Sequence, residues 1–407
     1  MTKFWENIKL ALMAIRTNKG RAFLTMLGII IGVFVIIILI GVGQSIKKEV
    51  SKQVEGLGSN LLVVLPGKME KGSVPTGLVG ESTLTIKDVD IIKNTAGVQF
   101  VSPLMFASAQ VSYQGQIARG AIPLGTNPAI QYTVQGESTS GQTHGQMFAD
   151  EDVVNKAKKA VIFTGLKNQF FPNEDPIGKK ILLNKEEFEI VAYKETEASV
   201  TFGQESEFDN MVLIPYTVAE SINNSNKVHR IAIKVAEAEQ VKDVQEKIKT
   251  ELLAAHDGIE EFTIFTQEEI LSMFDQILSL MTNMLLTLAI ISLIVGGIGI
   301  MNIMLVSVTE RTKEIGLRKA VGASNSSILI QFLTEAVILG LFGGVIGVGL
   351  AKVGSLIVKY KFNFEPIINF YSVGVAIGFS LVIGIIFGVA PAIRASRLKP
   401  IDALRYE

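Results

Sequence analysis

The sequence predicts an integral membrane protein, in which four transmembrane helices carry a large α+β domain inserted between the first and second helix. Hydrophobic residues make up 48% of the 407 residues and charged residues only 19%, which is below the roughly 25% of soluble domains. Four long stretches contain no charged residue, so the 38 basic and 39 acidic residues all lie outside them. The chain therefore combines membrane spans with a sizeable aqueous domain.

The first span is expected at residues 22–43, inside the uncharged stretch from Ala22 to Ile46. A cleaved leader ending near Gly43 is the alternative, but the apolar run is longer than the roughly 7–15 residues of a leader.

Residues 1–21 place Phe4 and Trp5 on one helical face and predict a helix in the cytoplasmic membrane interface. A solvated leader is the alternative for that segment.

The segment 44–275 predicts an extracytoplasmic domain. It holds 22 basic and 32 acidic residues, a net charge of −10, whereas the remainder carries +9. Alternating patterns predict strands, and 3.6-residue patterns predict helices. The expected strands are 60–65, 99–111, 180–193, 211–214 and 230–235, and the expected helices are 86–94, 153–159 and 241–255. The polar stretches at 125–145 and 223–226 predict the two ends of an inserted lobe at about 126–221.

The second span, at 276–308, predicts a helix that continues well outside the membrane. Thr266 and Glu269 form a capping-box pattern, which predicts a helix start before the span. Apolar residues then follow a coiled-coil spacing. These seam residues are Ile270, Phe274, Ile277, Met281, Met284 and Leu288. A helix from Ile270 to Val308 is ~58 Å long, nearly twice the ~30 Å bilayer core, so we expect a stalk. A tilted helix with a frayed end is the alternative.

Residues 309–326 predict a short charged helix between the second span and a third span at 327–351. Ser307 with Glu310 predicts its start, Gly322 its end, and Ser324 the cap of the third span. Glu314 and Arg318 form a favourable i,i+4 pair. Such a helix is suited to receive force from a soluble partner, and an ordinary positively charged loop is the alternative. A short outer loop at 352–365, a fourth span at 366–393 and a tail at 394–407 follow.

Close glycine pairs in the spans predict tight packing between helices. The main candidates are Gly28 with Gly32, Gly340 with Gly344, and Gly384 with Gly388. Gly374 and Gly378 form a further pair. The alternative is that glycine is simply common in membrane helices.

The distribution of Lys and Arg predicts that both termini are cytoplasmic. Five basic residues lie in 1–21, four in 309–326 and four in 394–407, whereas the loop 352–365 has three. Basic residues concentrate in short cytoplasmic loops, so the protein is expected in the plasma or inner membrane with 44–275 on the far side.

Several kinds of chemistry are not expected. No cysteine is present, which excludes disulfides and thiolate sites. His144, His229 and His256 are scattered without ligand spacing, so no metal site is expected. No paired nucleophile and base is visible, and we expect no catalytic residue, no cofactor on this chain and no nucleic-acid partner.

Two motifs resemble the signature of FtsX/MacB-type ABC transporter permeases. The first runs from Met301-Asn302 through Thr309-Glu310-Arg311 to Glu314–Ala323, and the second from Pro391 to Glu407. The stretch Arg16–Gly32 resembles the opening of that family, and Phe171–Lys179 resembles a recurrent piece of its outer domain. The resemblance spans essentially the whole chain.

The resemblance implies a MacB-like type VII ABC transporter fold and a dimer. It implies that the loop helix couples to a nucleotide-binding subunit and transmits ATP-driven movement to the outer domain. The implied ATPase-coupling residues are Glu310, Arg311, Lys313, Glu314, Ile315, Gly316, Leu317, Arg318, Lys319, Ala320 and Gly322. No G-x-x-x-x-G-K-[ST] loop is present, because Ile177-Gly178-Lys179-Lys180 lacks the upstream glycine and the hydroxyl. The ATPase is therefore expected on a separate chain.

This arrangement resembles the separate permeases of Gram-positive MacB-like systems, which implies a companion ATPase and an adaptor resembling a membrane-fusion protein. The function expected first is a permease subunit for efflux of peptides, toxins or macrolide-like drugs, including antimicrobial peptides. An FtsX-like signal transducer that controls a cell-wall hydrolase is the second interpretation. A Lol-type lipoprotein-releasing permease is the third.

Overall fold

The computed structural model describes residues 19–56, 58–68, 82–134, 142–195, 207–362 and 364–404. The chain divides into two compact units: a helical unit of Met1–Ile46 with Leu278–Glu407, and a sheet unit of Lys47–Ile277. The expected interfacial helix at 1–21 lies almost wholly outside the described residues.

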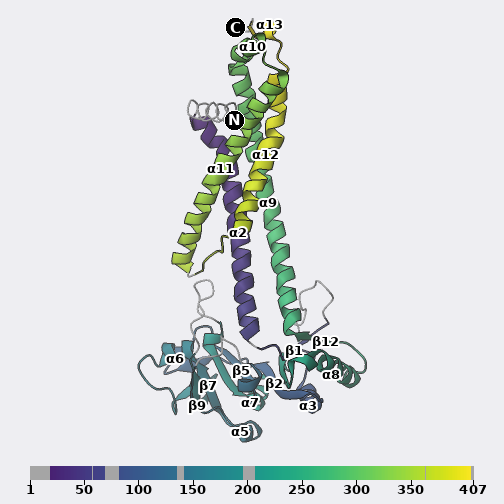
Figure 1. The fold of residues 1–407 in the computed structure, drawn as a ribbon. Coiled ribbons are helices and arrows are strands. Elements are labelled where there is room, and N and C mark those ends of the chain that lie inside the picture. Colours follow the sequence, from purple (N-terminus) through teal and green to yellow (C-terminus); the bar gives the residue numbers. More distant parts are fainter. Residues whose placement is uncertain are drawn as a thin grey trace. The chain divides into compact units, whose positions relative to one another are not determined.

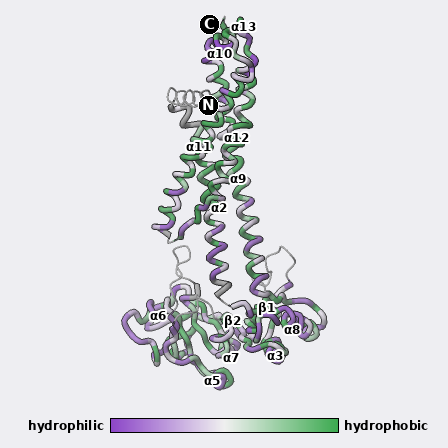
Figure 2. Tube along the Cα trace, in the orientation of Figure 1, coloured by the Kyte–Doolittle hydropathy of each residue, from purple (hydrophilic) through white to green (hydrophobic). Residues whose placement is uncertain are grey.

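The helical unit contains helices that are long and apolar enough to cross a membrane. Over the described residues there are four: α2 (Lys19–Gly56), α9 (Gln267–Glu310), α11 (Asn325–Phe362) and α12 (Phe370–Ser396). The prediction of four apolar helices is thus confirmed. Two short helices, α10 (Thr312–Ala320) and α13 (Pro400–Leu404), accompany them (Figure 1). Hydrophobic residues run along the long helices (Figure 2).

Helix α9 begins where the capping pattern predicted. The Glu269 carboxylate accepts a hydrogen bond from the Thr266 backbone N–H at 2.8 Å, and the Thr266 hydroxyl accepts one from the Glu269 N–H at 3.1 Å. The helix has 44 residues. At ~1.5 Å per residue it extends over about 66 Å, roughly twice the ~30 Å bilayer core.

The sheet unit is built on one twelve-stranded sheet, in which eleven strands form a continuous path. Its strands are β1 (Leu61–Pro66), β2 (Val98–Phe106), β3 (Val111–Tyr113), β4 (Gln116–Ile117), β5 (Ile122–Thr126), β6 (Thr143–Gly145), β7 (Lys159–Phe163), β8 (Lys180–Leu183), β9 (Glu186–Lys194), β10 (Met211–Pro215), β11 (Arg230–Val235) and β12 (Phe262–Thr266). They pair in the order β12-β1-β11-β2-β5-β10-β7-β9-β8-β3-β4, and β6 pairs with β9. Most pairs are antiparallel, while β5–β10 and β7–β9 are parallel.

Helices cover both faces of this sheet. They are α3 (Ile86–Asn94), α4 (Ile130–Thr133), α5 (Asp150–Val154), α6 (Thr164–Phe170), α7 (Tyr216–Asn223) and α8 (Val241–Ala255), with short 3₁₀ turns at Glu207–Asn210 and Ala238–Gln240. The mixed arrangement is the α+β domain that the sequence predicted. The β12-β1-β11-β2 end forms a first lobe, and the strands beyond β2 form a second lobe.

Three details differ from the prediction. The expected strand 99–111 ends at Phe106, and β3 begins only at Val111. Strand β3 also pairs with β8, although it precedes the expected inserted lobe at about 126–221. The expected helix 153–159 is also wrong: α5 ends at Val154, Lys156 adopts a φ of +52° that no helix continues through, and β7 begins at Lys159.

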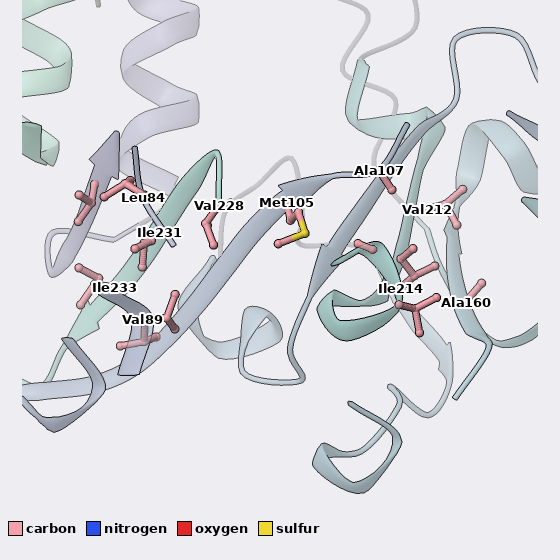
Figure 3. Packing of buried hydrophobic residues seen from close by; sticks show 14 of the residues in the cluster. Leu84, Val89, Met105, Ala107, Ala160, Val212, Ile214, Val228, Ile231 and Ile233 are labelled. Atoms are coloured by element: carbon pink, nitrogen blue, oxygen red, sulfur yellow. The ribbon is translucent and has the colours of Figure 1, made fainter. Parts of the chain in front are cut away.

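One hydrophobic core extends through both lobes. Figure 3 shows it continuing from Ile231 and Val228 through Met105 to Val212 and Ile214. Alternate residues of the second-lobe strands face the other way. Leu213 and Val161 belong to a second, smaller core on the opposite face.

Candidate functional site

The charged segment between the second and third spans folds into helix α10 with a break before it and a turn after it. Helix α9 runs unbroken through Ser307 to Glu310, so the predicted helix start at Ser307 is wrong. The chain leaves helical geometry only at Arg311, with φ −102° and ψ 16°, and α10 begins at Thr312. The Thr312 hydroxyl donates to the carbonyl oxygens of Val308 and Thr309 at 3.1 and 2.8 Å and stabilises this break.

The end of α10 follows the prediction. Gly322 has φ +100°, a conformation that favours glycine. The Gly322 N–H donates to the Lys319 carbonyl at 3.1 Å and the Ala323 N–H donates to the Arg318 carbonyl at 3.0 Å, which is a Schellman end. The Ser324 hydroxyl then accepts the Ser327 N–H at 3.2 Å and caps α11.

Helix α10 buries one face. Thr312, Ile315 and Gly316 are buried and share this face by their three- and four-residue spacing. A Cβ atom on Gly316 would lie 2.6 Å from the Ala403 Cβ, so α13 packs directly on the glycine. Figure 1 shows α10 and α13 together near the C-terminal end of the chain.

Lys319 extends the buried face toward the end of α12. Its Nζ donates to the carbonyl oxygens of Ser396 and Leu398, each at 2.7 Å. Carbonyls at a helix C-terminus lack helical partners and carry partial negative charge, so the ammonium stabilises this end. Lys319 therefore anchors α10 to the segment between α12 and α13.

Two arginines anchor α10 to α11. Arg311 Nη1 lies 3.3 Å from Glu335 Oε2, and the Glu335 residue is only 6% exposed. Arg318 donates to Gln331 Oε1 and to Glu314 Oε1, both at 2.7 Å. A buried carboxylate is costly unless paired, so the Arg311–Glu335 contact fixes the α9–α10 break against α11.

The opposite face of α10 is exposed and partly apolar. Leu317 is 59% exposed and Val321 is 83% exposed. Ile401 and Leu404 of α13 are also exposed. We name these four residues the α10–α13 surface. Lys313 and Glu314 lie beside it and are exposed. Large exposed apolar groups rimmed by charge are typical of protein–protein contacts.

The predicted coupling residues thus divide into two groups. Ile315, Gly316 and Lys319 hold α10 in place, and Arg311 and Arg318 do so through α11. Lys313, Leu317, Ala320 and Gly322 are exposed, as is Glu310. The sequence interpretation omitted α13, Gln331 and Glu335 from the site. The signal for α13 was the Pro400 start of a short helix, and for Glu335 the carboxylate that interrupts an apolar stretch.

The candidate packing glycines lie at helix contacts. A Cβ on Gly28 would lie 2.6 Å from Gly296 Cα, and one on Gly32 would lie 2.6 Å from Leu293 Cγ. The remaining candidates contact neighbouring helices in the same way: Gly340 and Gly344 meet Ser380, and Gly384 and Gly388 meet Ala336. Among the described residues, no atom of another helix lies within 4 Å of such a Cβ at Gly374 or Gly378, so tight packing within the chain is wrong for that pair.

The seam residues lie on a face of α9 that the other described residues leave largely exposed. Met281, Met284 and Leu288 are 57%, 65% and 61% exposed, and Phe274 is 36% exposed. Ile270 and Ile277 are partly exposed. The buried face of α9 is a different one, formed by Ala289, Leu293, Gly296 and Ile300. One face of α9 therefore packs against other helices of the chain, and a second face is exposed.

Comparisons with known proteins give two matched families. Residues 22–251 match the MacB-like periplasmic core domain, and residues 286–400 match the FtsX-like permease C-terminal domain. The second match contains all of α10 and reaches the first residue of α13.

Relatives match over nearly the whole chain. The "Macrolide export ATP-binding/permease protein MacB" of Bdellovibrio bacteriovorus is 34% identical over 409 residues, covering 99% of this chain and 62% of that protein. The chain thus spans about three fifths of the MacB relative. The "Uncharacterized ABC transporter permease YknZ" of Bacillus subtilis is 32% identical, with 99% of both chains covered. The crystal structure of the periplasmic region of MacB from Actinobacillus actinomycetemcomitans is 17% identical with a TM-score of 0.46, covering 55% of this chain and 96% of that one.

Proposed function

This chain belongs to the family of ABC transporter permeases that join a MacB-like periplasmic core domain to an FtsX-like permease domain, and from this premise we propose that it couples ATP hydrolysis on a separate ATPase chain to movements of its sheet unit. The α10–α13 surface carries the proposal. Leu317, Val321, Ile401 and Leu404 offer an apolar contact for a soluble subunit, and Lys313 and Glu314 supply charges at its edge.

The anchoring of α10 supports force transmission. Lys319 ties α10 to the end of α12, and Arg311 and Arg318 tie it to α11. A displacement of the α10–α13 surface by a bound ATPase is therefore passed to those two helices rather than absorbed by a loose loop. Helix α9 is continuous from Gln267 to Glu310, which supports the proposal that a movement at its α10 end is transmitted along the helix.

The proposed topology places both chain termini in the cytoplasm and residues 44–275 outside it. The concentration of Lys and Arg in residues 1–21, 309–326 and 394–407 supports this orientation. The negative charge of 44–275 agrees with an outer location, as does the periplasmic core family that this segment matches.

We propose that the working form is a dimer of this chain. The exposed seam of Phe274, Met281, Met284 and Leu288 on α9 has the spacing for a second helix of the same kind. The proposed transport role is efflux of peptides, toxins or drugs, with a membrane-fusion-like adaptor meeting the sheet unit. Macrolide export in the names of the MacB relatives supports efflux.

The test is the pair of substitutions Leu317→Asp and Val321→Asp in one tagged chain. We expect the wild-type chain, purified in lipid nanodiscs, to retain an ABC ATPase and to show ATP hydrolysis. The double variant places two carboxylates on the α10–α13 surface, and we expect it to lose at least nine tenths of the bound ATPase, because buried unpaired charges at an interface are costly.

Val154→Asp is the matched control. Val154 is 78% exposed in the sheet unit, so the same chemical change is made on an exposed valine far from α10 in the sequence. We expect this variant to keep wild-type ATPase retention. Full retention by the Leu317/Val321 variant, or a wild-type chain that retains no ATPase, contradicts the proposal.

A further inference from the structure

Different helices pack on the two faces of the sheet in the second lobe. Val212 and Ile214 of β10 face the large core, which α6 and α7 also join. Leu213 points to the opposite face, because side chains alternate along a strand. Two short helices contribute to that face, α4 with four residues and α5 with five, together with Tyr216 at the start of α7. A cavity of about 140 Å³ remains there.

The floor of this cavity is apolar. Leu124, Val161, Phe163 and Leu213 line it, and each is at most 6% exposed. The pocket is partly open to solvent, and its size is close to that of an enclosed apolar cavity of about 150 Å³ that holds one benzene molecule. The space under α4 therefore suits an apolar group of about the size of one aromatic ring.

Three polar residues, Gln131, Thr143 and Lys194, are among those that line the cavity. The strand register sets two of them beside each other. Thr143 of β6 pairs with Lys194 of β9, and Phe163 of β7 pairs with Lys194 from the other side. The Thr164 hydroxyl also donates to the Lys194 carbonyl at 3.2 Å, which holds this part of the strand.

Lys194 differs from the neighbouring lysines in its electrostatic surroundings. Lys159 lies 2.7 Å from Asp152, and Lys180 lies 2.7 Å from Glu187. Burial lowers the pKa of Lys194, and no carboxylate of the described residues offsets that effect. A half-buried ammonium that no carboxylate of the described residues neutralises is stabilised by an anion that reaches it.

We propose that this cavity binds an organic carboxylate, whose apolar group of about one aromatic ring fills the floor and whose carboxylate accepts a hydrogen bond from Lys194. Thr143 supplies a second donor at the same position. A free aromatic acid and the C-terminal residue of a peptide share this chemistry. The site belongs to the sheet unit and stands whether or not an ATPase binds at α10.

The test uses the full-length chain in detergent-free lipid nanodiscs. The probes are 3-phenylpropionate and its amide, and the peptide Gly-Gly-Phe with a free or an amidated C-terminus, each measured by ligand-detected NMR. We expect at least one free acid to bind about tenfold or more tightly than its amide, because a charge-assisted hydrogen bond is made only by the acid. Binding of both acids identifies a peptide terminus as an accepted source, and binding of phenylpropionate alone restricts the source to free acids.

Lys194→Met is expected to lower the affinity of the acid to that of the amide, while Lys194→Arg retains a preference for the acid. Lys180→Met, which removes a lysine from outside the cavity, is the matched control and is expected to change nothing. Val161→Phe fills the floor and should abolish binding of acid and amide alike. Equal binding of acid and amide by the wild type, no binding of any probe, or an unchanged Lys194→Met variant overturns the proposal.

Discussion

In the helical unit the helices approach one another at glycines, whereas the core of the sheet unit is filled by large side chains. At the α2–α9 contact, a Cβ on Gly28 would lie 2.6 Å from Gly296 Cα, so backbone meets backbone. In the sheet unit, Phe171 and Phe188 are fully buried among isoleucine, leucine and valine side chains.

The difference follows from the surroundings that each unit is built for. Lipid tails are as apolar as leucine, so burying a large side chain between membrane helices gains little, and close backbone approach supplies the attraction instead. In water, burial of apolar area is the main source of stability, and large side chains supply most of it. Each unit should therefore be sensitive to opposite changes: added atoms in the helices and removed atoms in the sheet.

The largest effect is expected for Phe188→Ala in β9. Phe188 is 0% exposed in the main core, and truncation of a buried phenylalanine costs ~3–5 kcal/mol because a cavity remains. Hydrogen exchange followed by mass spectrometry should show faster exchange in β7, β8 and β9, with α11 and α12 unchanged.

Phe188→Leu keeps most of the volume and is the control, with an expected cost of about 1 kcal/mol. Equal exchange rates in the alanine and leucine variants would show that the stability of the sheet unit does not depend on side-chain volume at this position.

The next effect is expected for Gly28→Ala. One added carbon meets the Gly296 backbone, which has no flexible side chain to yield, so a cost of ~1–3 kcal/mol is expected. Gly374→Ala is the matched control, since a Cβ there meets no other helix of the described chain within 4 Å. Alanine is the better helix former by up to ~1 kcal/mol, so the control should be neutral or more stable. The measurement is the fraction of protein that survives heating in nanodiscs, and the same loss in both variants would contradict the packing argument.

The four long helices could be predicted from the sequence because a long apolar stretch without charges is typical of a membrane-spanning helix. The α9 start at Thr266 and the α10 end at Gly322 depend on neighbours three to five residues away, so local patterns were sufficient. The false helix start at Ser307 shows the limit: a capping pattern is overridden when the apolar helix continues through it.

Long-range contacts could not be predicted from local patterns. The Ala403–Gly316 contact joins residues 87 positions apart, and Arg311–Glu335 depends on how α11 returns past α10. In the sheet unit, β3 pairs with β8 although more than sixty residues separate them, and no local pattern indicates that pairing. The cavity beside Lys194 likewise exists only because β6, β7 and β9 come together.

The sheet unit also has carboxylates held by lysines, which makes it sensitive to acid. The Lys159 ammonium and the Ala149 N–H lower the pKa of Asp152, and hydrogen bonds from Lys249 and Lys68 lower the pKa of Glu260. A carboxylate whose pKa is lower in the folded state stabilises the fold above its unfolded pKa, near 4. That stabilisation is lost as the pH falls through the folded value.

The smallest effect is therefore expected for Asp152→Asn, below ~1 kcal/mol, because the ion pair with Lys159 is partly exposed and screened. The variant should unfold slightly more easily than the wild type at pH 6, and the difference should vanish as the pH falls well below about 4, where the wild-type carboxylate is itself protonated. Hydrogen exchange of α5 and β7 across that pH range measures the difference, with Asp150→Asn in the same helix as the control. A difference that persists at low pH would mean that Asp152 acts through the shape of its side chain rather than through its charge.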